Sequence, residues 1–227
     1  EAKYLNQKLK NNLLIVRITR PTTVEIMDFI KSELKYFPTI NLIIDYSNKG
    51  FAKIIKEDSR KNNIGMIMLT SEMFKNKENT KSVMELKIPV FKFGKEKLKS
   101  IKRTVIVLND TNSYEQISPI VFDISSQLKV KTKIFDLDPI GEKDGKSSLL
   151  DHFENLAKIF NEKLEVVTSG ENPIRELKKQ RNMLQILPLK DEMFKKRFSF
   201  KFLYTNSDFI AFDMNKFNQL LIPIVEE

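Results

Sequence analysis

Two parts of this 227-residue chain repeat one another at a constant offset. Each part opens with an apolar run rich in branched residues and passes through a helical stretch to a second apolar run, at 13–18 and 40–46 and again at 104–109 and 131–137. Each half also closes on an apolar segment with a proline near its middle, at 88–91 and 222–225. A duplicated strand–helix unit is typical of two copies of one α/β architecture.

The spacing of apolar residues predicts strands and helices in alternation along both halves. The first half is expected to hold strands at 13–18, 40–46, 64–69 and 88–93, with helices at 22–37, 51–61 and a Lys-rich helix ending near Leu86. The second is expected to hold strands at 104–108, 130–137, 164–168, 183–187 and 220–225, with helices at 113–128, 147–163 and 173–181. Between 192 and 219 the pattern is weaker: 198–204 alternates like a strand, and 208–217 suits a short helix.

This alternation with short connections predicts an α/β protein with two Rossmann-like open, mostly parallel sheets and flanking helices. We expect a shortened first domain at 1–96 and a second domain at 97–227, packed together because the basic linker 94–102 is short. The segments 88–93 and 220–225 are rich in branched and aromatic residues, and we expect them at sheet edges that seek partners.

The composition excludes several kinds of site and leaves the meaning of the charge open. The chain has no cysteine and one histidine, His152, so disulfides, thiolate metal sites and imidazole clusters are excluded. The net charge is +9, and the excess lies in residues 1–100, with 20 Lys+Arg against 11 Asp+Glu. Lysine far outnumbers arginine, so solvated lysine faces are the main interpretation, and a surface for anionic lipid or nucleic acid is the alternative.

The second half ends its first strand with Val105-Ile106-Val107-Leu108-Asn109-Asp110-Thr111 and closes on 220–225, written around Pro223. This order of elements resembles the universal stress protein family, whose sheet is Rossmann-like, as in the adenine nucleotide alpha hydrolases. The resemblance covers 103–227 and, in a form that lacks one strand and helix, 11–93. It implies that 88–93 and 220–225 pair with each other, which would make the chain an intramolecular pseudo-dimer, with a homodimer as a further form of self-association.

The chain departs from the nucleotide-binding members of that family. Those members carry a glycine-rich loop, Gly-x2-Gly-x9-Gly-Ser/Thr, after the fourth strand, where backbone N–H groups can approach phosphates. The six glycines here form no such motif, and two acids, Asp191 and Glu192, follow strand 183–187 instead. The segment 71–75 after strand 64–69 also lacks glycine. We therefore expect no ATP binding by the family's usual contacts and no cofactor.

Asp110 and Thr111 are the candidate ligand-binding residues, because they follow the carboxyl end of a parallel strand, where ligands of open α/β sheets bind. An ordinary cap or loop aspartate is the alternative. Asp45, Asp136 and Asp138 end the second strands and are read as loop residues, and no metal site is expected. No catalytic residue is expected either, since Ser147, Ser148 and His152 lie on one helix without a nucleophile elbow. The glycines of 141–145 suit a flexible turn, and the basic aromatic run 194–204 suits an edge strand or a stacking surface for bases.

Our leading hypothesis is a regulatory or interaction module that is not an enzyme. Degenerate tandem modules of this family occur as cytoplasmic domains of cation/proton (Na+/H+) antiporters, and the lost glycine loop, the start at Glu1 without methionine and the basic lead-in favour that setting. The partners would be the membrane part of a parent transporter and anionic lipid at the cytoplasmic face of the inner membrane, near Lys3, Lys8, Lys10, Arg17 and Lys53. Two alternatives stay open: a free-standing cytoplasmic universal stress protein that binds a nucleotide or other small ligand, and a nucleic-acid-binding protein that uses the basic first half.

Overall fold

The computed structural model describes residues 2–9, 14–18, 24–25, 28, 31–32, 40–44, 50–108, 114–137, 146–160, 164–168, 172–198 and 205–224. The helices are α1 Ala2–Lys8, α3 Phe51–Lys61, α4 Ser71–Lys75, α5 Lys77–Leu86, α6 Tyr114–Leu128, α7 Lys146–Ile159, α8 Pro173–Lys179, α9 Asp191–Phe198 and α10 Asn206–Phe212, with a 3-10 turn η1 at Leu98–Ser100. The strands are β1 Leu14–Ile18, β2 Ile40–Ile44, β3 Ile67–Thr70, β4 Val90–Phe93, β5 Arg103–Leu108, β6 Lys131–Asp136, β7 Glu165–Thr168, β8 Met183–Leu189 and β9 Asn218–Pro223.

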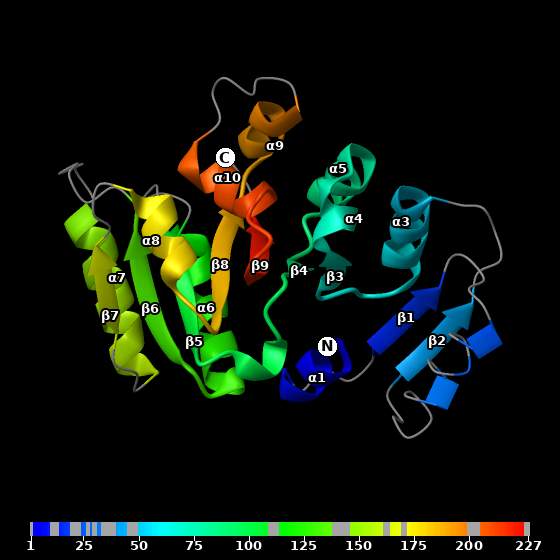
Figure 1. The fold of residues 1–227 in the computed structure, drawn as a ribbon, viewed down its shortest axis with the longest axis horizontal. Coiled ribbons are helices and arrows are strands. Elements are labelled where there is room, and N and C mark those ends of the chain that lie inside the picture. Colours follow the sequence, from blue (N-terminus) through cyan, green and yellow to red (C-terminus); the bar gives the residue numbers. More distant parts are fainter. Residues whose placement is uncertain are drawn as a thin grey trace.

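Seven strands form one sheet in the order β3-β4-β9-β8-β5-β6-β7 (Figure 1). All neighbouring strands are parallel except β4 and β9, which are antiparallel. This confirms the predicted α/β class with a mostly parallel sheet and flanking helices. β3 and β4 come from the first half of the chain and the other five strands from the second, so one sheet runs through both halves. β1 and β2 form a separate parallel pair, in which Leu14 lies opposite Ile40.

β4 and β9 lie inside the seven-stranded sheet and not at its edges. Val90 lies opposite Leu221 and Phe91 opposite Leu220, so these strands satisfy each other's backbone groups. The segments 88–93 and 220–225 are expected from the sequence at sheet edges that pair with each other, and β4 and β9 do pair. Each strand also has a second neighbour, β3 for β4 and β8 for β9, so neither is an edge of the seven-stranded sheet. In the part of the sheet that the structure describes, the outermost strands are β3 and β7.

Helices cover both faces of the sheet with two apolar clusters. On one face α4, α8, α9 and α10 contribute Phe74, Leu177, Met193 and Ile210 to the first cluster. On the other face α6 and α7 pack through side chains such as Phe122 and Phe153. Every residue of β8 is buried, as expected for a central parallel strand covered on both sides.

The segment before the first strand is a short amphipathic helix. Leu5 of α1 is 1% exposed and joins the second cluster, whereas Gln7 and Lys8 are exposed. The sequence identified this stretch as a polar lead-in and did not predict the helix. Two apolar residues, Leu5 and Leu9, one turn apart are the signal that was available.

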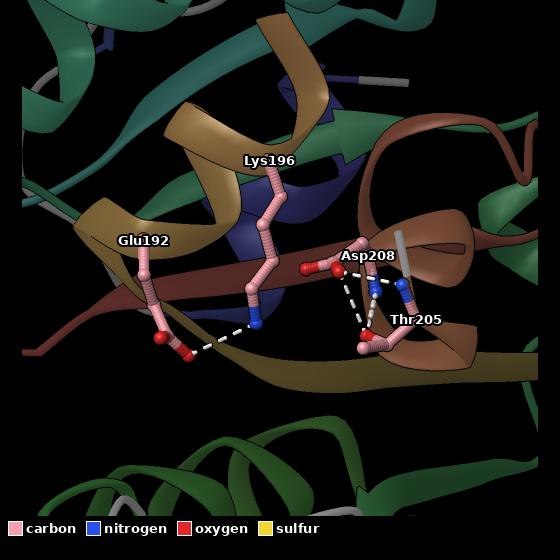
Figure 2. A network of polar contacts seen from close by, with 4 residues as sticks. All are labelled: Glu192, Lys196, Thr205 and Asp208. Carbon is pink, nitrogen blue, oxygen red and sulfur yellow. Dashed lines mark hydrogen bonds and ion pairs between the residues drawn. The ribbon is translucent and has the colours of Figure 1, made fainter. Parts of the chain in front are cut away.

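The segment 191–212 differs from its prediction. Phe198 ends helix α9, so the strand expected at 198–204 does not begin there, and 199–204 lie outside the described residues. α9 has acids in its first turn and Lys195, Lys196 and Arg197 in its last, a distribution that the helix dipole favours. α10 starts at a capping box formed by Thr205 and Asp208 (Figure 2).

Most other elements begin or end within a few residues of the predicted positions, and α3 spans 51–61 as predicted. Of the helix predicted at 22–37, only Val24, Glu25, Asp28, Lys31 and Ser32 lie within the described residues, so most of it is outside them. Within the described part of the chain, no helix is both long and apolar enough to cross a membrane.

Candidate functional site

The carboxyl ends of β5 and β8 define the place where a ligand of this sheet would bind. β5 pairs with β6 on one side and with β8 on the other. The chain therefore leaves β5 toward one side of the sheet and later crosses to its other side. In open α/β sheets such a switch point forms the ligand crevice. Asp110 and Thr111 follow β5 directly but lie outside the described residues, as do Asp45 and Asp138. The ligand pocket at Asp110 therefore stays a prediction.

The structure describes the strand–helix junction that stands where a phosphate loop would follow β8. A single residue, Lys190, separates Leu189 of β8 from the first turn of α9. The Lys190 carbonyl accepts a hydrogen bond from Met193 N at 3.1 Å. This junction contains no glycine, and its first helical residues are the exposed acids Asp191 and Glu192.

Both acids of this junction have cationic partners. Lys87, which follows α5 with a φ of 53°, places Nζ 3.2 Å from both carboxylate oxygens of Asp191. Lys196, one turn along α9, lies 3.5 Å from Glu192 (Figure 2). The Lys87–Asp191 pair joins the two halves of the chain across the carboxyl edge of β8. The pair is partly exposed, so it contributes at most about 1 kcal/mol to stability.

The equivalent junction of the first half lies between β3 and α4, and its hydroxyl groups also form hydrogen bonds within the protein. Thr70 ends β3 and caps α4, since its hydroxyl oxygen accepts a hydrogen bond from Met73 N at 3.2 Å. The hydroxyl of Ser71, the first residue of α4, donates to the carbonyl of Phe93 at 2.7 Å. Neither half thus presents a glycine loop with unused backbone N–H groups after this strand.

Three polar side chains lie buried side by side where β4, β9 and β8 meet. Lys92 is opposite Gln219, and Gln219 is opposite Gln185. All three are 0% exposed. Gln219 Nε2 donates to Gln185 Oε1 and to the carbonyl of Ile210 in α10, both at 2.7 Å. We call Lys92, Gln219 and Gln185 the buried polar row; it crosses the join between the halves.

Lys92 is the one charged member of this row. Its Nζ donates to the carbonyls of Ala211 at 2.6 Å and Met214 at 3.3 Å, and it lies 5.6 Å from the centre of the Phe74 ring. Burial lowers the pKa of the Lys92 ammonium from an ordinary 10.5 to about 7; the charge of Lys75 acts in the same direction and that of Asp213 opposes it. Its protonation therefore changes near neutral pH.

Sequence reasoning missed the buried polar row. The signal was a polar residue inside an otherwise apolar strand: Lys92 in Val90–Phe93, Gln185 in Met183–Leu189 and Gln219 in Asn218–Pro223. These polar residues stand out in the sequence, but nothing within any one of the three strands indicates that their side chains lie together. Their meeting depends on the pairing of β4 with β9, which are far apart in the sequence.

His152, the only histidine of the chain, joins two helices. His152 of α7 places Nε2 2.9 Å from the hydroxyl of Ser118 in α6, and Ser118 is 0% exposed. This contact ties α6 to α7 under the sheet and offers no open nucleophile. In the described residues no group of three or more His, Asp or Glu side chains could hold a metal ion.

Comparison with known proteins identifies the fold. No family model and no curated protein matches the sequence. A universal stress protein from Archaeoglobus fulgidus DSM 4304 superposes with a TM-score of 0.59 at 12% identity, over 98% of this chain and 92% of that one. A protein of Pseudomonas aeruginosa UCBPP-PA14 that carries the provisional name of universal stress protein gives 0.60 at 12% identity, over 92% of this chain and 81% of that one.

A protein of unknown function from Pseudomonas aeruginosa PAO1 gives a TM-score of 0.58 at 11% identity, over 92% of this chain and 81% of that one. Such identities establish the fold and not the activity. The chain therefore has the fold of the universal stress proteins.

Proposed function

We propose that the chain is a degenerate tandem module of the universal stress protein type, with a regulatory or interaction role and no chemistry of its own. The seven-stranded sheet supports this proposal, because its second half supplies five parallel strands and its first half supplies β3 and β4. The antiparallel pairing of β4 with β9 would then be the contact of an intramolecular pseudo-dimer.

The observation that carries the proposal is the junction between β8 and α9. A bound nucleotide would place its phosphates at the start of this helix, where Asp191 and Glu192 project negative charge. Lys87 and Lys196 already pair with these acids, so neither of these two cations is free to bind a phosphate. We infer that the module responds to a partner or to a ligand other than a nucleotide bound through its phosphates.

Isothermal titration calorimetry of the whole chain with ATP and with AMP tests this inference. We expect no binding at micromolar concentrations. Micromolar binding by the unaltered chain would instead support the alternative of a free-standing universal stress protein that binds a nucleotide through Asp110 and Thr111.

The expected failure to bind nucleotides has two possible causes, the missing glycine loop and repulsion by the two acids. A variant with both acids neutralised, Asp191→Asn and Glu192→Gln, separates these causes. Without a glycine loop, loss of the acids alone should not create a site, and the variant should also give no heat of binding. Binding by this variant alone would mean that the acids exclude nucleotides and that the rest of the junction can accept them, contrary to the proposal.

We propose the cytoplasmic domain of a cation/proton antiporter as the setting of this module. Its support is the sequence pattern of a repeated scaffold whose phosphate loop is lost in both halves. The gene segment that encodes this chain should then lie downstream of membrane-spanning helices, and removing the segment should change the ion or pH dependence of transport. A gene without such helices would contradict the setting and would leave the calorimetric prediction unaffected.

A further inference from the structure

Positive charge gathers at the amino edge of the second half of the sheet. β5, β6, β8 and β9 are parallel and begin at this edge, and β4, antiparallel to β9, ends there. Basic residues occupy the linker, the end of α8, the turns before the strands and the first positions of β5 and β6: Lys95, Lys97, Lys99, Lys102, Arg103, Lys129, Lys131, Lys178, Lys179, Arg181 and Lys216. We call this set the basic edge.

The linker of the basic edge is fixed to the turns beside it. Lys95 N donates to the carbonyl of Asn215 at 2.9 Å, before β9, and Lys102 N donates to the carbonyl of Asn182 at 2.8 Å, before β8. The linker thus runs along the ends of β9 and β8 from β4 to β5. It brings lysines of the first half beside basic residues of the second, although the second half carries as many acidic as basic residues.

The charge of the basic edge is only partly offset by acids: Glu96 lies within the linker, where its carboxylate accepts a hydrogen bond from Asn182 N at 3.0 Å. All its members are exposed except Arg103 and Lys216, which are half-buried. Among the described residues, no carboxylate forms an ion pair with any of them. The nearby acid Glu165 pairs with Lys133, and its pKa is lowered first by that hydrogen bond and then also by the charges of Arg103 and Lys131.

We propose that the basic edge is a docking surface for an anionic lipid bilayer. The five strands that end or begin there span about 20 Å, so their turns present a broad surface to many headgroups at once. Exposed lysines near an anionic membrane add binding energy without a defined pocket.

The composition of this surface favours lipid over nucleic acid. Arg103 and Arg181 are the arginines of the set and the rest are lysines, which bind phosphate as point charges without the bidentate fork that reads bases. Stacking on bases needs exposed aromatic rings. Phe217 at this edge is 0% exposed, and Tyr4, whose ring centre lies 5.9 Å from Lys99 Nζ, is half-buried. The inference does not rest on the proposed function, because a free-standing protein could dock in the same way.

Co-sedimentation of the whole chain with vesicles tests the docking surface. Vesicles of phosphatidylglycerol mixed with phosphatidylcholine should retain the chain at low ionic strength, and pure phosphatidylcholine vesicles should not. Retention should fall steeply as salt is added. Replacing three exposed lysines together, Lys95→Gln, Lys97→Gln and Lys102→Gln, should weaken partitioning by roughly fivefold for each lysine removed.

The matched control removes the same charge elsewhere, by Lys61→Gln, Lys77→Gln and Lys158→Gln on α3, α5 and α7, where all three lysines are exposed. It should bind vesicles nearly as well as the unaltered chain. An equal loss in both variants, or no retention of the unaltered chain by anionic vesicles, would overturn the proposal. Displacement from the vesicles by single-stranded or duplex nucleic acid at a lower phosphate concentration than lipid would overturn it in favour of nucleic acid.

Discussion

Lys92 is a cation that the fold holds between two backbone carbonyls inside the protein. β4 carries the side chain, and the end of α10 supplies the acceptors Ala211 and Met214. The folded pKa of about 7 lies below the ordinary value of 10.5, which the unfolded chain regains. Between these two values the unfolded chain binds the additional proton, so the contribution of Lys92 to the free energy of unfolding rises with pH and levels off above the unfolded pKa.

We predict that Lys92→Met removes this pH dependence. Urea denaturation between about pH 7 and pH 9 should show the free energy of unfolding of the unaltered chain rising faster than that of the variant. The difference between the two slopes is limited to about 1.4 kcal/mol per pH unit, the value for one proton. Lys53→Met, at an exposed lysine of α3, should leave the slope unchanged. Equal slopes for Lys92→Met and the unaltered chain would show that Lys92 keeps an ordinary pKa.

At the scale of elements, β9 carries the join between the halves. It pairs with β4 on one side and β8 on the other, and Ile222 within it is 4% exposed. A lysine at this position would place an ammonium group in the second apolar cluster, at the cost of its hydration.

We therefore expect Ile222→Lys to lower the free energy of unfolding by about 3 kcal/mol or more, measured by urea denaturation. Val166→Lys, in the outermost described strand β7, is the matched control, because Val166 is 40% exposed and should cost less than about 1 kcal/mol. If Ile222→Lys were no more destabilising than this control, β9 would not be a buried strand.

The elements that the sequence predicted well are those whose apolar pattern is local. β2, α3 and β5 lie at or within a residue of the predicted start, because one strand or helix period already shows which side chains face the core. The segment around Phe194 and Phe198 misled the prediction, since it alternates like a strand. In the structure these two rings lie 4.8 Å apart, one helical turn from each other.

The candidate site was less accessible from the sequence. The acids at the start of α9 and the missing glycines could be read directly from the sequence, but the contact of Lys87 with Asp191 joins residues of different halves. Lys92 is likewise buried because α10 packs over the paired strands β4 and β9. The spacing of apolar residues in the sequence does not indicate that α10 lies there. Both features depend on contacts between segments that are far apart in the sequence. A single helix or strand, by contrast, can be predicted from the spacing of apolar residues within one segment.

At the scale of the whole molecule, the seven-stranded sheet joins both halves into one unit. Apolar clusters on both faces include residues from β3 or β4 together with residues of the second half, such as Val90 with Leu221 and Phe91 with Leu220. A core shared in this way leaves neither half with a complete set of neighbours. We therefore expect β3 and β6, which lie far apart in the sheet, to unfold in the same transition.

Gly94 offers a perturbation that tests this coupling. A Cβ at Gly94 would lie 2.2 Å from the backbone C and O of Phe217 and 2.8 Å from Asn218 N, so Gly94→Ala must push the linker away from the start of β9. We expect a loss of about 3 kcal/mol, whereas Gly65→Ala, with nothing within 4 Å of the new Cβ, should not destabilise the protein. Hydrogen exchange followed by mass spectrometry at increasing urea should show peptides of β3 and β6 losing protection together, at a lower urea concentration in Gly94→Ala than in the unaltered chain. In a single cooperative sheet, a substitution at the contact between the halves destabilises both of them. Loss of protection in β3 at a much lower urea concentration than in β6 would therefore mean that the halves unfold separately.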